Sequence, residues 1–335
     1  MTDKVKWGIL STANIGVAKV VPAMMKGERT QVAAIASRDL ATAQAAAAKL
    51  GIGKAYGSYE ALLADPEIEA IYNPLPNHLH VPWTLKALAA GKHVLCEKPI
   101  AITAAEARQL LAAREASGKI VAEAFMVRHH PQWIRAREHV RSGTLGDVRA
   151  IQTTFSYFNV DPNNVRNKAD IGGGGLLDIG CYAVATARYI FGTEPTRAVG
   201  LNETDPTFGT DRLASGIVAF SDHRRLTFTC STQLVPYQRV QILGTKGRLE
   251  IEIPFNAPPD TPCRILFDDG SDLGGGGISI ETFPVVDQYT LQGDALSRMV
   301  RGEIPPEFGL EDAIANMRVL DALARSGQTG AWEQV

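Results

Sequence analysis

The sequence has few of the features that mark several large classes of protein. Its 335 residues include only four cysteines, and none belongs to a C-x-x-C pair or another metal-finger spacing. Lys and Arg number 34 against 36 Asp and Glu, so no basic excess indicates nucleic acid or a membrane as partner. No apolar run approaches the roughly 18 residues of a membrane-spanning helix. Because no secretory signal opens the chain, we expect a cytoplasmic protein with reduced thiols.

Several catalytic motifs are missing as well. The chain contains neither G-x-x-x-x-G-K-[ST] nor G-x-S-x-G, so ATPase and serine-hydrolase activities have no support. His78 and His80 lie two residues apart at a helix start and so do not share a helix face, and the adjacent His129 and His130 have no carboxylate at ligand spacing. No metal site is therefore expected. Apolar residues make up 45% of the chain, which is enough for a sizeable core, and the length predicts two domains.

The pattern of apolar residues divides the chain near residue 123. Residues 1–123 alternate short apolar strands with capped helices, which predicts an α/β domain with a parallel sheet. In residues 124–335, consecutive strand-like stretches predict an α+β domain built on a mostly antiparallel open sheet. The stretch Pro258–Gly277, rich in Pro, Gly and Asp, is interpreted as a surface loop.

The turn after the first strand has small residues where a dinucleotide-binding fingerprint has glycines. Ser11, Ala13 and Gly16 stand at the three fingerprint positions. Backbone can still approach a pyrophosphate there, and a helix N-terminus follows it. We therefore expect the run Ser11, Thr12, Ala13, Asn14 and Ile15 to hold the cofactor. An ordinary strand–helix turn is the alternative.

The end of the second strand indicates which dinucleotide binds. NAD-binding units usually place a carboxylate about 20 residues past the last glycine, to hold the ribose hydroxyls. This chain has Ser37 and Arg38 there, which can bind a 2′-phosphate, and this pattern favours NADP. A solvated Arg38 before a helix cap is the alternative, and the nearby Asp39 leaves some use of NAD open.

A Glu97-Lys98-Pro99 turn follows the strand that ends at Cys96. Ligands of open parallel sheets bind beyond the carboxyl ends of the strands, so Lys98 is expected beside the nicotinamide. Proline directly after a strand also predicts a cis Lys98–Pro99 bond.

Together with this turn, two further runs resemble the Gfo/Idh/MocA oxidoreductase family. They are Tyr72-Asn-Pro-Leu-Pro-Asn77-His-Leu-His80 and Gly172-Gly-Gly-Gly-Leu-Leu-Asp178-Ile-Gly-Cys-Tyr182. Position 182 has Tyr, where many family members have His. In this respect the chain resembles glucose–fructose oxidoreductase, the NADP-dependent D-xylose dehydrogenases and dimeric dihydrodiol dehydrogenase. The resemblance implies a Rossmann domain, a second domain whose open sheet makes a homodimer or homotetramer, and further cofactor contacts from Pro74, Leu75, Asn77, His80, Glu97 and Lys98.

Asp178 and Tyr182 lie four residues apart at the start of a predicted helix, so both face one side. Hydride transfer from a hydroxyl needs a base and a cation near the reacting oxygen. We interpret Tyr182 as the base, Lys98 as the cation, and Asp178 as an acceptor for a sugar hydroxyl or a partner of Lys98. A capping Asp178 and a core Tyr182 are the alternative.

The remaining candidates are residues that could bind substrate. We expect Arg128 and Arg166 to contact a sugar; the alternative is that either arginine forms an ion pair at the surface. Trp133, Tyr157 and Phe158 are candidates for stacking on a sugar, although core packing is commoner for aromatics. These residues predict NADP-dependent oxidation of an aldose to a lactone. The alternatives are an aldose–aldose or glucose–fructose oxidoreductase with tightly bound NADP(H), a trans-dihydrodiol dehydrogenase, and a non-catalytic NADP or sugar sensor.

Overall fold

The computed structural model describes residues 3–335, which form two compact units. The first unit contains the chain up to Met126 together with Gln288–Ile314, and the second contains Val127–Asp287 and Ala315–Val335. The sequence predicted two contiguous domains, 1–123 and 124–335. The units differ from them chiefly because the segment Gln288–Ile314 belongs to the first unit.

A six-stranded sheet forms the centre of the first unit, with the order β3-β2-β1-β4-β5-β6 and every pair parallel. This order is that of a dinucleotide-binding Rossmann sheet, as the sequence predicted. The strands are β1 (Val5–Leu10), β2 (Thr30–Ala36), β3 (Lys54–Tyr56), β4 (Ala70–Asn73), β5 (His93–Cys96) and β6 (Val121–Glu123).

Capping residues set the ends of the helices in this unit. Asp39, Ser58 and Thr103 each accept a backbone N–H at a helix N-terminus, and Gly51 and Gly118 end helices with positive φ. The helices are η1 (Gly16–Val20), α1 (Val21–Met24), α2 (Leu40–Leu50), α3 (Tyr59–Leu63), η2 (Asn77–Leu79), α4 (His80–Ala89), α5 (Ala104–Ser117) and α8 (Gln288–Val300).

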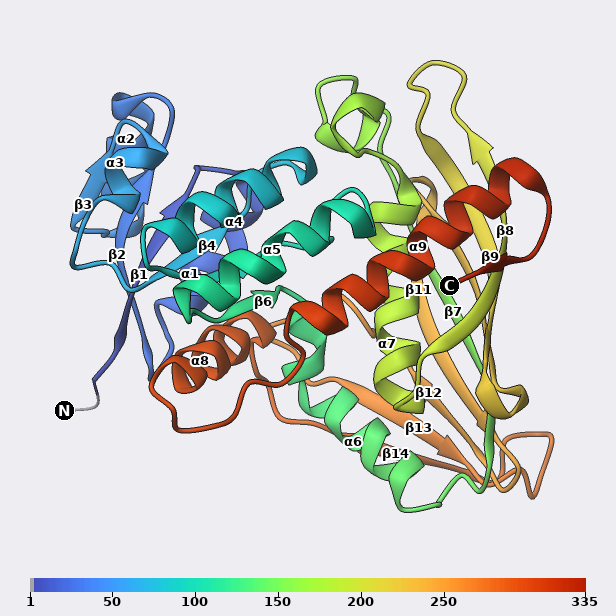
Figure 1. Ribbon diagram of the computed structural model, residues 1–335. Helices are drawn as coiled ribbons and strands as arrows, with labels where there is room; N and C mark the ends of the chain where they lie inside the picture. Colours follow the sequence, from blue (N-terminus) through green and yellow to red (C-terminus); the bar gives the residue numbers. More distant parts are fainter. Residues whose placement is uncertain (1–2) are drawn as a thin grey trace. The chain divides into compact units, whose positions relative to one another are not determined.

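Helix α8 is distant in the sequence, yet it packs beside α1 and β2 and completes the core of the first unit (Figure 1). Leu296 is buried in one apolar cluster with Trp7 and Met24. The Trp7 indole donates to the Ser297 hydroxyl at 3.1 Å. Because α8 completes this core, the first unit is built from two stretches of the chain that are separated by most of the second unit.

The second unit contains a nine-stranded sheet with the order β14-β13-β12-β11-β7-β10-β9-β8-β15. Only β7 and β10 pair in parallel, so the expected, mostly antiparallel sheet is confirmed. The strands are β7 (Val148–Phe158), β8 (Pro195–Thr204), β9 (Asp211–Phe220), β10 (Arg225–Ser231), β11 (Gln233–Gly244), β12 (Arg248–Ile251), β13 (Arg264–Asp268), β14 (Ile278–Thr282) and β15 (Glu333–Gln334).

One prediction about this sheet is wrong, because β13 lies within the expected loop Pro258–Gly277. Ile265 is fully buried and pairs with Ile251 of β12. The strand has only five residues and is flanked on both sides by residues typical of loops, so the sequence pattern does not indicate it.

Helices α6 (Pro131–Arg141) and α7 (Cys181–Phe191) lie on one face of the sheet, and every residue of α7 is buried (Figure 1). In the part of the chain that the structure describes, no helix covers the opposite face. The other helical segments are η3 (Met126–His129), η4 (Val165–Asn167), η5 (Ala169–Ile171), η6 (Leu176–Gly180), η7 (Ser221–His223) and α9 (Leu310–Thr329).

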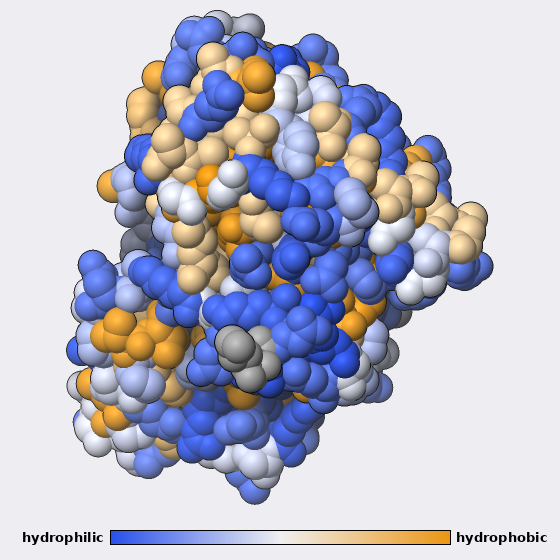
Figure 2. Space-filling view, turned by 90° about the vertical axis from the view of Figure 1, so that its left-hand side faces the viewer, coloured by the Kyte–Doolittle hydropathy of each residue, from blue (hydrophilic) through white to orange (hydrophobic). Residues whose placement is uncertain are grey.

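The surface and the helices show no feature of a membrane-spanning helix within the described residues. Among residues 3–335, no helix is both long and apolar enough to cross a membrane. On the face shown in Figure 2, hydrophilic side chains prevail and hydrophobic ones form small separate groups. Scattered exposed apolar residues of this kind are normal for a folded protein.

Candidate active site

The turn after β1 presents helix amides to an anion. The first backbone bond of the helix runs from the Val17 N–H to the Ala13 carbonyl at 3.0 Å. The amides of Asn14, Ile15 and Gly16 precede it, so they have no acceptor within the helix. With Ser11 and Ala13 providing only small side chains, the residues of this turn fit a dinucleotide pyrophosphate.

Ser11 has a backbone conformation that favours glycine. Its φ is 106°, and its hydroxyl oxygen accepts the Ala13 N–H at 3.2 Å. A non-glycine residue in such a region costs about 1–3 kcal/mol. The hydroxyl offsets part of that cost, which explains how serine is accommodated at a glycine position.

Replacing Ser11 by Gly is expected to leave the protein at least as stable as the wild type, whereas Ser11→Ala keeps the strain and loses the hydrogen bond. The glycine variant should be more stable than the alanine variant by about 1–2 kcal/mol. Urea unfolding of both variants measures this difference. Equal stability of the two would show that the strain is absent.

The end of β2 fits a 2′-phosphate. Ser37 is buried and Arg38 is exposed beside it. The Asp39 carboxylate accepts from the Thr42 N–H at 2.8 Å and the Thr42 hydroxyl at 2.6 Å, and these bonds lower its pKa. Asp39 therefore serves as the cap of α2, which leaves Arg38 as the charged side chain for a ligand phosphate.

The loops after β4 and β5 are linked by a buried histidine. The ring nitrogens of His80 lie 2.6 Å from the Leu75 carbonyl and 2.7 Å from the Pro99 carbonyl. Burial lowers the pKa of His80 to about 4. Both nitrogens face backbone carbonyls, and the neutral ring that this pKa implies can donate to one of them, so the His80 ring bridges the two loops. Pro74 and Leu75 are buried, and Asn77 is half-buried.

Glu97 shapes the turn that carries Lys98. It accepts from the Tyr72 hydroxyl at 2.7 Å and from the Lys98 N–H at 3.3 Å. The Lys98–Pro99 bond is cis, which confirms that prediction. Lys98 is half-buried at the carboxyl edge of the sheet, where a bound nicotinamide is expected.

In the second unit, three predicted residues form a hydrogen-bonded group. One oxygen of the half-buried Asp178 accepts from the Tyr157 hydroxyl at 2.6 Å and from the Arg166 Nε at 2.8 Å. The Asp178 charge raises the pKa of Arg166, and burial together with Asp178 raises that of Tyr157. Arg166 and Tyr157 thus both hold Asp178 in place, and Tyr157 does so through its hydroxyl group and not through its ring.

Tyr182 lies one turn beyond Asp178, where η6 continues into α7. It is 5% exposed, with its ring centroid 5.8 Å from that of Phe155 and 5.2 Å from that of Phe255. The Tyr182 phenol is also within electrostatic reach of Arg166. These contacts hold the ring in one orientation, a property that a core residue and a catalytic phenol share.

The other candidates have simpler surroundings. Arg128 is buried in η3. Trp133 is buried and donates its indole N–H to the Pro254 carbonyl at 2.7 Å, so it belongs to the core, whereas Phe158 is 63% exposed. Among residues 3–335, no three His, Cys, Asp or Glu side chains come together as a metal site.

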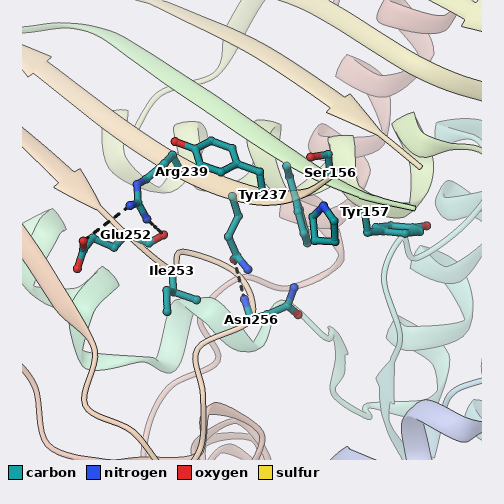
Figure 3. Close-up of a pocket in the computed structure, with 10 residues that line it drawn as sticks. Ser156, Tyr157, Tyr237, Arg239, Glu252, Ile253 and Asn256 are labelled. Carbon is teal, nitrogen blue, oxygen red and sulfur yellow. Dashed lines mark hydrogen bonds and ion pairs between the residues drawn. The ribbon is translucent and has the colours of Figure 1, made fainter. Parts of the chain in front are cut away.

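A cavity of about 490 Å³ lies between β7, β11 and the segment after β12 (Figure 3). Tyr237, Asn256 and the Arg239–Glu252 ion pair line it. Phe155 and Tyr157 also line this cavity, and they contact Tyr182 and Asp178 respectively. The cavity itself includes neither Asp178 nor Tyr182.

Comparison with known proteins assigns the chain to a family. Residues 5–125 match the oxidoreductase family with an NAD-binding Rossmann fold, and residues 133–250 match the C-terminal domain of the same family. The chain belongs to the Gfo/Idh/MocA oxidoreductase family. The resemblance and the prediction of an oxidoreductase are thereby confirmed.

Relatives with full-length similarity include an uncharacterized oxidoreductase, ORF334, of Rhizobium meliloti, which is 46% identical over 99% of this chain and 100% of its own. A D-xylose 1-dehydrogenase (NADP(+)) of Haloferax volcanii is 40% identical over 97% and 98%. A trans-1,2-dihydrobenzene-1,2-diol dehydrogenase of Mus musculus is 37% identical over 74% of each chain.

Solved structures with the same fold include the aldose-aldose oxidoreductase of Caulobacter crescentus in complex with glycerol. It has a TM-score of 0.91 at 26% identity and covers 99% of this chain and 100% of its own. The 3-ketoreductase KijD10 of Actinomadura kijaniata, in complex with NADP and TDP-benzene, has a TM-score of 0.90 at 26% identity, with coverages of 97% and 98%.

Proposed function

We propose that this family member is an NADP-dependent sugar oxidoreductase that oxidises the anomeric hydroxyl of an aldose to a lactone. The observation that carries the proposal is the Asp178 carboxylate, which Arg166 and Tyr157 hold one turn before Tyr182. A fixed carboxylate beside a phenol suits a substrate with several hydroxyl groups. The similarity to an NADP-dependent D-xylose dehydrogenase supports the same substrate class.

The proposed mechanism gives each of the predicted catalytic residues one role. Tyr182 acts as its phenolate, a form that the positive charge of Lys98 favours, and takes the proton of the anomeric hydroxyl. The Lys98 ammonium also stabilises the negative charge that develops on that oxygen. Asp178 accepts a hydrogen bond from a neighbouring sugar hydroxyl, and Arg128 and Arg166 bind or orient the sugar side. NADP, when bound, supplies the acceptor for the hydride that leaves C1, so that a lactone remains.

The residues of the first unit support NADP as the cofactor. Ser11, Thr12, Ala13, Asn14 and Ile15 would hold the pyrophosphate, and Ser37 and Arg38 the 2′-phosphate. Pro74, Leu75, Asn77, Glu97 and Lys98 would line the nicotinamide side, with His80 supporting them.

Replacing Arg38 by Ala is expected to weaken NADP binding by about 10- to 100-fold, because a charge-assisted hydrogen bond to the phosphate contributes roughly 1.5–3 kcal/mol. NAD has no 2′-phosphate, so its dissociation constant should change less than about threefold. Fluorescence titration with both nucleotides measures the two effects. An equal loss for NADP and NAD would contradict a 2′-phosphate role.

The substrate proposal is tested by assaying the purified protein on a panel of aldoses and diols with NADP and NAD in parallel. We expect NADPH formation with at least one aldose. Copurified nicotinamide absorbance, together with exchange between two sugars, would instead indicate an aldose–aldose or glucose–fructose oxidoreductase. Turnover of trans-dihydrodiols alone would indicate a diol dehydrogenase, and binding of NADP without turnover would indicate a sensor.

We also propose a cytoplasmic homodimer or homotetramer that associates through the open face of the second sheet. Exposed apolar residues on strands of this sheet, such as Leu201 at 77% and Ile217 at 40%, support this arrangement. The four buried cysteine thiols suit a reducing compartment. Light scattering should give two or four times the chain mass of 36.0 kDa, and a monomer would reject the assembly.

A further inference from the structure

Asp211, the first residue of β9, reaches the turn that begins the helix of Asp178 and Tyr182. One oxygen of its half-buried carboxylate accepts the Leu176 N–H at 2.6 Å, and the Gly175 N–H also bonds to it. These two amides belong to the first turn of the η6–α7 helix, where backbone N–H groups have no partner within the helix. The carboxylate therefore supplies the acceptors that this turn needs.

The same carboxylate explains part of the glycine run before η6. A Cβ on Gly174, which has a φ of 115°, would lie 2.0 Å from an Asp211 oxygen. A Cβ on Gly173 would lie 2.6 Å from the Arg166 carbonyl. Neither position has room for a side chain, because Asp211 and the backbone around Arg166 fill the space.

The turn held in this way leads directly to the proposed catalytic group. The Asp178 N–H bonds to the Gly174 carbonyl at 3.1 Å, and the Gly174 N–H bonds to the Arg166 carbonyl at 2.9 Å. The Asp211 carboxylate thus fixes a backbone segment that is hydrogen-bonded to the main chain of both Arg166 and Asp178.

We propose that Asp211 is a positioning residue whose ionised carboxylate holds the Gly174–Leu176 turn, so that Asp178 and Tyr182 are presented together, and whose protonation loosens this turn. The claim that Asp211 holds the turn rests only on the contacts of its carboxylate. The claim that this affects catalysis rests on the proposed function. Asp211 itself has no assigned contact with substrate.

Two charged or titratable groups face this carboxylate. Asp178 on η6 raises the pKa of Asp211, while Cys230 on β10 has its own pKa raised by burial and by Asp211. Burial is the largest cause for Asp211, and it brings the pKa of this carboxyl to about 6. Protonation is therefore accessible just below neutral pH, and a protonated carboxyl is a weaker acceptor for amide N–H groups.

The test compares Asp211→Asn with Asp205→Asn in the full-length protein. Asp205 is a suitable control because its buried carboxylate also accepts two backbone amides, Thr207 at 2.7 Å and Phe208 at 3.0 Å, which belong to the β8–β9 connection and not to the Gly174–Leu176 turn. It also accepts from the Gln233 side-chain amide at 2.6 Å. Hydrogen exchange followed by mass spectrometry reports both loops without any enzyme assay. We expect D211N to speed exchange in a peptide spanning residues 172–182 by about tenfold, and D205N to leave that peptide unchanged while it speeds exchange in the β8–β9 connection.

The wild-type protein provides a second measurement that requires no variant to fold. After correction for the intrinsic exchange rate, protection of residues 172–182 should fall between pH 7 and pH 5, whereas D211N should show no such fall. A purely structural role that is independent of charge would produce no pH step.

The catalytic consequence is measured with whichever aldose the wild type oxidises. We expect D211N to lower kcat by about 10- to 100-fold with little change in the NADP dissociation constant, and D205N to leave kcat unchanged. Unaltered exchange in residues 172–182, or altered exchange with an unaltered kcat, would overturn the inference. If no sugar is turned over but exchange responds to D211N, the aldose proposal fails and the holding of the turn stands.

Discussion

Replacing Tyr182 by Phe is expected to lower kcat for the proposed aldose oxidation by about 100- to 10,000-fold, because the variant loses the phenol proposed to take the hydroxyl proton. Phe keeps the aromatic ring that packs against Phe155 and Phe255, so the free energy of unfolding should change little. The absorbance of NADPH in steady-state assays measures kcat, and thermal unfolding measures stability.

Tyr189→Phe provides the matched control for this variant. Tyr189 lies on the same helix, is also buried, and has the Arg137 guanidinium stacked on its ring at 4.3 Å. Loss of this hydroxyl should leave kcat within about twofold of the wild type. A Y182F enzyme with wild-type turnover would reject Tyr182 as the base, and an equal loss in both variants would point to disturbed packing of α7.

Replacing Lys98 by Met should lower kcat by about 100- to 1,000-fold. Met preserves an unbranched side chain but removes the ammonium that stabilises the charge developing on the reacting oxygen. The NADP dissociation constant should change less than kcat, since the proposed contacts with the pyrophosphate and the 2′-phosphate come from other residues. Steady-state kinetics and nucleotide titration separate the two effects.

Lys86→Met is the control, because Lys86 lies in the same unit and forms an exposed ion pair with Glu60 at 2.9 Å. An exposed pair of this kind contributes little to stability, so K86M should behave as the wild type. Wild-type kcat in K98M would remove the cation from the mechanism.

Elements with strong local signals could be predicted from the sequence. The caps Asp39, Ser58 and Thr103 bind amides only three residues away, so their pattern is visible in a short window. Strand β7 (Val148–Phe158) is also a local signal, because apolar and polar residues alternate along much of its length.

The shared carboxylate of Asp178 could not be predicted in the same way. Its two partners, Tyr157 and Arg166, precede it by 21 and 12 residues, and neither belongs to a motif with it. A strand, a loop and a helix have to pack before these side chains meet. The sequence could mark each residue as a candidate but contained no sign of their contacts.

Short motifs and local periodicity were enough to predict the family, the Rossmann unit with its small-residue turn and Arg38, and the candidate catalytic residues Lys98 and Tyr182. Packing of the folded chain was needed to show that α8 completes the first core, that β13 replaces a loop, and that Asp211 holds the turn before Asp178. These contacts join residues distant in the chain, and burial of apolar surface brings such residues together without any local signal.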